Sequence, residues 1–139
     1  MTLLLLFNQP PLHEDLLNSA HQFIDQGHYG VAVVLAQTAF EVFTAQVRAQ
    51  LIQKRHLTGM EAWISKATRR VVARIDFYVE VTNDPIKQDE AWRHYTNHMD
   101  RRHAVVHQGR QVSKDEAENS CRVVENMISR MKKAVEQQA

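Results

Sequence analysis

The sequence of 139 residues has few of the residues that cross-link or interrupt a chain. Its one cysteine, Cys121, cannot form a disulfide within the chain, and no secretory signal is visible, so we expect a reducing, cytoplasmic setting. Four glycines and three prolines are too few for a loop-rich or all-β fold. The formal net charge of only +1 excludes a protein that holds nucleic acid by overall charge alone, so any basic surface must be local.

Several binding and catalytic motifs are absent as well. The sequence has no Gly-rich phosphate loop, no Cys-x-x-Cys pair and no Gly-x-Ser-x-Gly, and it predicts no cofactor. The apolar stretch Leu3–Phe7 is too short to span a bilayer and lacks the flanking charges and cleavage site of a signal peptide. We therefore expect no membrane partner, and we expect residues 1–11 to form an apolar arm that packs on the core or on a second subunit.

The remaining chain has apolar residues spaced three and four positions apart, which predicts amphipathic helices. The predicted segments are 12–26, 28–54, 58–81, 84–109 and 113–135. The second is apolar on nearly every side and should be central. Capping boxes at Thr58–Glu61 and Ser113–Glu116, and the pair Asp84-Pro85, are typical helix starts. About five helices with short connections predict an all-α fold, an up-and-down antiparallel helical bundle that forms one domain over residues 1–139.

One charged residue breaks the apolar pattern of the fourth segment. At about 100° per residue, Arg102 points in the same direction as an apolar stripe formed by Ala91, Tyr95, Met99, Val105 and Val106. A guanidinium stays charged in a protein and is costly to bury without a partner. Glu41 interrupts the most apolar part of segment 28–54, and it is either the partner of Arg102 or a residue at the edge of the stripe.

Arg102 and His107 together could cleave RNA without a metal. Arginine binds phosphate through a fork of fixed donors, and histidine transfers protons near neutral pH. The ribose 2′-OH would attack its own phosphate, so the chemistry would be specific to RNA. The two residues lie about 140° apart on a straight helix. They therefore share a site only if the helix distorts, if it frays before Gly109, or if a second subunit completes the site.

The segment Arg102–His107 reads Arg-His-Ala-Val-Val-His and is followed by Gln108-Gly109. It resembles the Arg-x4-6-His signature of the HEPN superfamily (higher eukaryotes and prokaryotes nucleotide-binding domain). Residues 27–36 with Glu41 are similar to the long early helix of that family, and the capped last helix is similar as well. The resemblance therefore covers most of the chain.

The resemblance implies a HEPN-like bundle with metal-independent endoribonuclease activity, in a homodimer whose two motifs face one cleft. Arg102 and His107 would be catalytic, with His103, Arg101 and Glu41 supporting them. HEPN domains occur in toxin–antitoxin pairs, phage-defence systems and CRISPR-associated effectors, so the expected partners are RNA, a second copy and an antitoxin or other protein.

Two positions depart from the family pattern. His103 stands where the family often has Asn. Gly109 stands where some toxin members carry a Tyr that a partner nucleotidyltransferase modifies, so that regulation is not expected here.

Two other functions stay open from the sequence. Many HEPN domains are non-catalytic, so the chain could be a dimer that binds RNA, a nucleotide or a partner protein. It could instead be a helical-bundle metalloprotein, because bundles build metal sites from histidines four positions apart. The histidine pairs are His94 with His98 and His103 with His107, and the third ligand would be His13, His21 or Glu41.

Segment 58–81 also carries a basic strip of Lys66, Arg69, Arg70 and Arg74. Such a strip is either a solvated helix face or a landing surface for phosphates.

Overall fold

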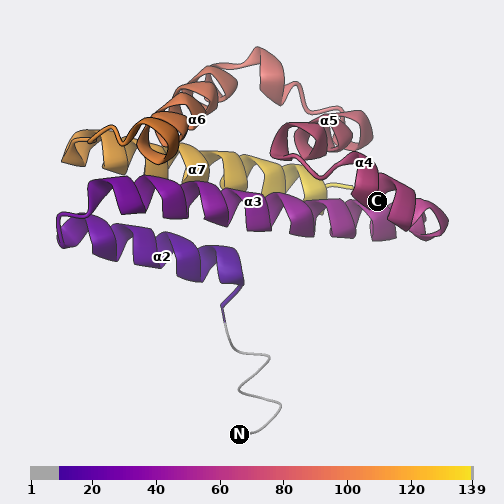
Figure 1. The fold of residues 1–139 in the computed structure, drawn as a ribbon. Helices are drawn as coiled ribbons and strands as arrows, with labels where there is room; N and C mark the ends of the chain where they lie inside the picture. Colours follow the sequence, from indigo (N-terminus) through magenta and orange to yellow (C-terminus); the bar gives the residue numbers. More distant parts are fainter. Residues whose placement is uncertain (1–9, 139) are drawn as a thin grey trace, which may run out of the picture.

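The computed structural model describes residues 10–138, and the expected apolar arm Leu3–Phe7 lies outside them. All regular structure in the described part is helical, as predicted, but it contains six α-helices instead of five. They are α2 (Leu12–Asp25), α3 (Tyr29–Lys54), α4 (Glu61–Ala67), α5 (Val71–Thr82), α6 (Glu90–Gln108) and α7 (Lys114–Glu136), with short 3-10 turns η1 (Thr58–Met60) and η2 (Ile86–Gln88) (Figure 1).

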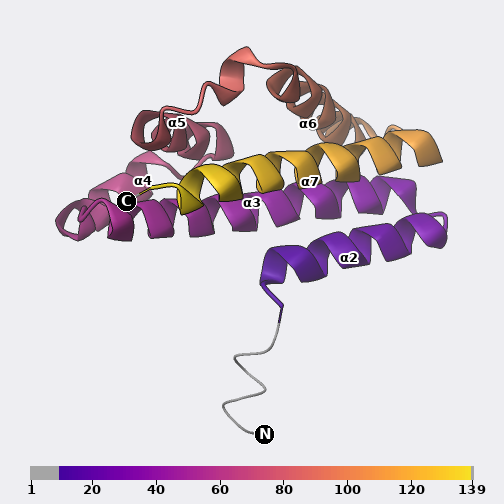
Figure 2. The ribbon, with the colours of Figure 1, turned by 180° about the vertical axis from the view of Figure 1, so that it is seen from behind.

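The long helix α3 is the centre of the bundle, as its all-round apolar pattern predicts. It lies between α2 and α7 (Figures 1 and 2), and Val33, Phe40 and Leu51 along its length are fully buried. By length and composition α3 could cross a membrane, but half of its most apolar part is buried by neighbouring helices. A core helix of a bundle has the same composition.

The predicted helix 58–81 is interrupted, which is a correction to the sequence prediction. The chain leaves the helical conformation at Thr68 and is extended at Arg70, with φ −86° and ψ 146°. The β-branched side chain of Thr68 disfavours helix, and its hydroxyl bonds the Ile64 carbonyl at 2.6 Å. The freed Thr68 carbonyl accepts hydrogen bonds from Arg48 at 3.1 Å and Arg74 at 3.0 Å. Thr58 forms no side-chain cap and lies inside η1.

This interruption changes the topology. Because α4 and α5 stay near the C-terminal half of α3, it is α6 that returns along the bundle, and α7 then runs in the same direction as α3 (Figures 1 and 2). At their adjacent C-terminal ends, Lys54 Nζ donates to the Val135 carbonyl at 3.0 Å. The long helices α2, α3, α6 and α7 therefore alternate in direction along the chain, but the five alternating helices of the prediction are not found in the described residues.

The start of the fourth predicted helix is also corrected. Asn83, in the left-handed conformation with φ 61°, ends α5, and α6 begins only at Glu90. Asp84 does not cap a helix, because its carboxylate is bound by Arg130 of α7.

The last helix follows the prediction. The capping box of Ser113 and Glu116 is present, with both hydrogen bonds at 3.1 Å. Cys121 is fully buried in the core on α7, and burial raises the pKa of its thiol to about 12. The thiol is thus inert, as its position in the apolar stripe indicates.

Candidate functional site

Helix α6 carries the predicted catalytic pair and is regular through Gln108. Gly109, with φ 64°, ends it, and the Arg110 amide bonds back to the Ala104 carbonyl at 3.1 Å. The helix neither distorts nor frays before Gly109. Arg102 is accordingly half-buried on the bundle side of α6, whereas His107 is exposed. Within one chain the two side chains do not meet.

The Arg102 guanidinium has no partner within the described residues 10–138. Its Nε is buried without a hydrogen-bond acceptor, and the side chain forms no ion pair there. Its positive charge lies near His98 and Tyr95, which share the inner face of α6. Because the guanidinium forms no hydrogen bond within residues 10–138, its accessible part is free to bind an external anion.

The Nε of the neighbouring Arg101 is also buried without a hydrogen-bond partner, but its terminal nitrogen Nη1 is bound. Its Nη1 donates to the Glu116 carbonyl at 3.0 Å, to Ser120 Oγ at 2.7 Å and to Asn119 Oδ1 at 3.3 Å. All three acceptors are on α7. Arg101 therefore fixes α6 against α7, and any support that it gives the site acts through the position of the helix.

His103 and His107 share the outer face of α6, as their spacing of four predicts. Both are exposed, and their ring centroids are 4.5 Å apart. Both rings are thus accessible to a bound substrate.

The structure gives little support to the metalloprotein alternative. Among residues 10–138, no group of three His, Cys, Asp or Glu side chains is placed to hold a metal ion. His98 points into the core while His94 is exposed beside Glu90. Of the proposed third ligands, His13 packs on Phe43 and His21 pairs with Glu125 at 3.0 Å.

A buried polar network between α3 and α6 lies one turn from Arg102. His98 Nε2 is 3.1 Å from Gln37 Oε1, and the Gln37 amide donates to the Tyr95 hydroxyl at 3.1 Å. Burial, together with the charges of Arg101 and Arg102, lowers the pKa of His98 to about 4, so the ring is neutral at pH 7. Its Nε2 is thus the donor to Gln37, and Nδ1 has no partner.

This network was not predicted from the sequence. Gln37 was the available signal, because it interrupts the apolar segment 28–54 just as Glu41 does. The network holds the inner face of α6 on α3 and so helps to fix the direction of Arg102.

Glu41 lies at the edge of the apolar stripe. It is half-buried and forms no ion pair with Arg102, so the predicted pairing is not found. Glu41 instead lines a groove of about 620 Å³ between α3, the start of α5 and α6. We call it the Arg69–Arg70 groove, and its other lining residues are Arg69, Arg70, Val71, Val72, Arg74 and Met99.

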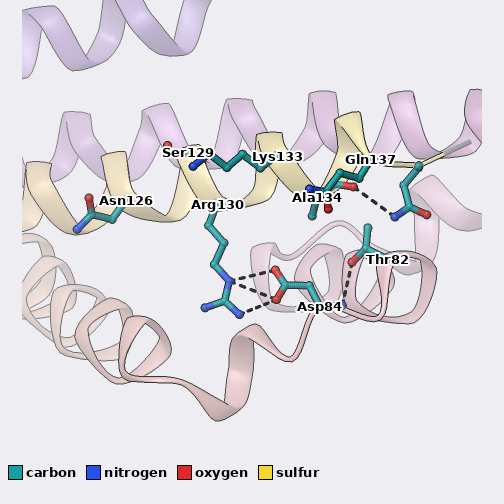
Figure 3. A pocket seen from close by; sticks show the side chains of 9 residues that line it. Thr82, Asp84, Asn126, Ser129, Arg130, Lys133, Ala134 and Gln137 are labelled. Carbon is teal, nitrogen blue, oxygen red and sulfur yellow. Dashed lines mark hydrogen bonds and ion pairs between the residues drawn. The ribbon is translucent and has the colours of Figure 1, made fainter.

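A second polar cluster joins α5 to α7, beside a hollow of about 550 Å³ (Figure 3). Arg130 Nε and Nη2 bind the Asp84 carboxylate at 2.6 to 3.2 Å, and Nη1 lies 2.6 Å from Asp89 Oδ2. Tyr78 donates its hydroxyl proton to Asp84. Burial alone would raise the pKa of Asp84, but the bonds from Arg130 and Tyr78 lower it below its usual value. Every group at the centre of the cluster is paired, which is the arrangement of a structural tie.

No family model, curated protein or solved structure matched this chain in the three comparisons. A function must therefore be argued from the residues of α6 and the surfaces beside it.

Proposed function

We propose that this protein is a metal-independent endoribonuclease of the HEPN type that acts as a homodimer. The observation that carries the proposal is the half-buried Arg102, whose Nε has no acceptor within residues 10–138. The accessible part of this unpaired guanidinium can donate charge-assisted hydrogen bonds to a phosphate of RNA. His107, five positions later, supplies a proton-transfer group at the spacing of the HEPN signature.

The reaction would proceed by attack of the ribose 2′ oxygen on the adjacent phosphorus. One imidazole takes the 2′-OH proton, and a protonated imidazole returns a proton to the leaving 5′ oxygen. The products are a 2′,3′-cyclic phosphate and a free 5′-OH. Arg102 stabilises the negative charge on the non-bridging oxygens as it builds up. His107 and His103, with rings 4.5 Å apart, are the two imidazoles.

Arg102 and His107 lie on opposite sides of α6 in one chain, and a homodimer would bring them together from two copies. In a two-fold assembly, Arg102 of one copy can face His107 of the other across a shared cleft. Val106, between the two histidines, is 45% exposed and offers an apolar contact at the end of α6. The supporting roles of Arg101 and Glu41 are then to fix α6 on α7 and to line the groove that leads to the site.

The test is cleavage of a labelled single-stranded RNA in EDTA. We expect the wild type to cleave, and we expect Arg102→Ala and His107→Ala to lose cleavage. Arg122→Ala, which removes an exposed arginine of α7, is the matched control and should retain it. No cleavage by the wild type, or undiminished cleavage by both site variants, would contradict the proposal.

Mixing the two inactive variants tests the dimer. If one copy supplies Arg102 and the other supplies His107, mixed dimers of Arg102→Ala and His107→Ala contain one intact site and recover part of the activity. If each copy carries a complete site, the mixture stays inactive.

The second candidate is a non-catalytic dimer that binds RNA, a nucleotide or a partner protein. The separation of Arg102 and His107 within one chain favours it, because binding needs only the arginine. This candidate predicts salt-dependent RNA binding that Arg102→Ala weakens, with no turnover. Within either candidate, a role in a toxin–antitoxin pair or in phage defence would add an antitoxin or another protein as partner, in the cytoplasm.

A further inference from the structure

The Arg69–Arg70 groove is positively charged. Three arginines, Arg69, Arg70 and Arg74, face one carboxylate, that of Glu41, which leaves a local charge of +2. Arg48 is a further cation close to Arg74. Burial and then the charge of Arg48 lower the pKa of Arg74, whereas the charge of Glu41 raises it. An anion in the groove would relieve this crowding of cations.

The arginines around the groove are of two kinds. Arg74 donates to the carbonyls of Glu41 at 3.0 Å and Arg69 at 2.7 Å, and both Arg74 and Arg48 donate to the Thr68 carbonyl. They are committed to the main chain and fix the break between α4 and α5. Arg69 and Arg70 lie on that fixed backbone with exposed side chains, which form no hydrogen bond or ion pair to any described residue. Their backbone is fixed, and their guanidinium groups have no partner among the described residues and are open to a ligand.

The floor of the groove suits a nucleic acid strand. Val72 is 44% exposed, and Val71 and Met99 also line the groove, so sugar and base surfaces would meet apolar side chains while phosphates meet the guanidinium groups. Helix α5 starts here without a side-chain cap, so its first amide groups add further donors.

The groove reaches α6 at Met99, one turn before the proposed catalytic arginine. Met99 lies three positions before Arg102 on the same face of α6, and residues at this spacing are neighbours on a helix surface. We infer that the Arg69–Arg70 groove binds the phosphate backbone of single-stranded RNA and directs the strand to Arg102. This inference rests on the proposed function and names the surface that holds its substrate.

Fluorescence anisotropy with a labelled single-stranded RNA tests the inference. The background is full-length His107→Ala, which prevents cleavage during the measurement. Adding Arg69→Ala and Arg70→Ala should weaken binding about tenfold or more and flatten the salt dependence by roughly 1.4 in log–log slope, the value expected for two lost phosphate contacts. Arg69→Lys with Arg70→Lys should restore most of the affinity, because the charge remains. Arg122→Ala with Lys132→Ala, two exposed cations of α7, is the control and should bind as the background does.

The outcomes separate this inference from the function on which it rests. RNA binding that is unchanged by the two alanines overturns the groove and leaves the ribonuclease proposal intact. No binding by the His107→Ala background overturns the ribonuclease proposal itself. Poly-glutamate that displaces the RNA at equal charge concentration would show a surface for an acidic protein segment and would also overturn the inference. In the wild-type background, we expect the two alanines to raise KM and to leave kcat unchanged at saturating RNA.

Discussion

Arg130 and Arg102 are both half-buried arginines on long helices of the same bundle, yet their surroundings are opposite. Arg130 binds Asp84 through Nε and Nη2 (Figure 3) and Asp89 through Nη1, whereas Arg102 has no acceptor among residues 10–138. A buried charge that is paired can hold two elements together. A buried charge without a partner lowers the stability of the folded state. The comparison indicates that Arg130 serves the fold, and under the proposed function the unpaired Arg102 binds a phosphate of RNA.

The largest expected effect is on stability, at Arg130. Arg130→Ala leaves the Asp84 carboxylate, which is 11% exposed, without its cation, and should lower the free energy of unfolding by about 2–3 kcal/mol. Urea unfolding followed by circular dichroism measures the change. An unchanged urea midpoint would show that the ion pair does not stabilise the fold, and the difference drawn between Arg130 and Arg102 would then be wrong.

The next effect is a pH dependence that originates at His98. The folded-state pKa of about 4 lies below the usual 6.5, so the unfolded chain binds more protons between these values. The contribution of neutral His98 to the free energy of unfolding is therefore fully present above pH 6.5. The free energy of unfolding should fall by about 2–3 kcal/mol as the pH drops to 4. Arg102→Met removes one of the two nearby cations, so it should raise the pKa of His98 and reduce this loss. If the free energy of unfolding of Arg102→Met depends on pH in the same way as that of the wild type, the Arg102 charge does not affect the pKa of His98.

A smaller effect is expected at Arg101, which is next to Arg102 in sequence. Arg101→Ala removes three hydrogen bonds to α7 and should cost about 1–2 kcal/mol of unfolding free energy. Thermal unfolding would measure it, with Arg101→Lys as a variant that keeps the charge. If Arg101→Ala costs no more than Arg102→Ala does, the distinction between the two neighbours fails.

The sequence was sufficient for those features that depend on local periodicity. The stripes of α2, α3 and α7, the capping box at Ser113 and the inward position of Arg102 all follow from spacing along one helix. The separation of Arg102 from His107 follows from the same geometry.

Features that depend on contacts between distant residues could not be predicted. The break at Thr68 is stabilised by Arg48, twenty residues earlier, and Asp84 binds Arg130, forty-six residues later, instead of starting a helix. The network of Gln37 with His98 likewise joins two helices. A periodic pattern contains no information about which polar group on another helix will meet these side chains.

The most direct test of the central claim measures activity and stability together in Arg102→Met. Cleavage of single-stranded RNA in EDTA is expected to fall at least about a hundredfold, the loss typical of removing one transition-state donor. The free energy of unfolding is expected at the same time to stay within about 0.5 kcal/mol of the wild type, or to rise. Undiminished cleavage, or a loss of stability like that of Arg130→Ala, would show that Arg102 serves the fold and would contradict the account.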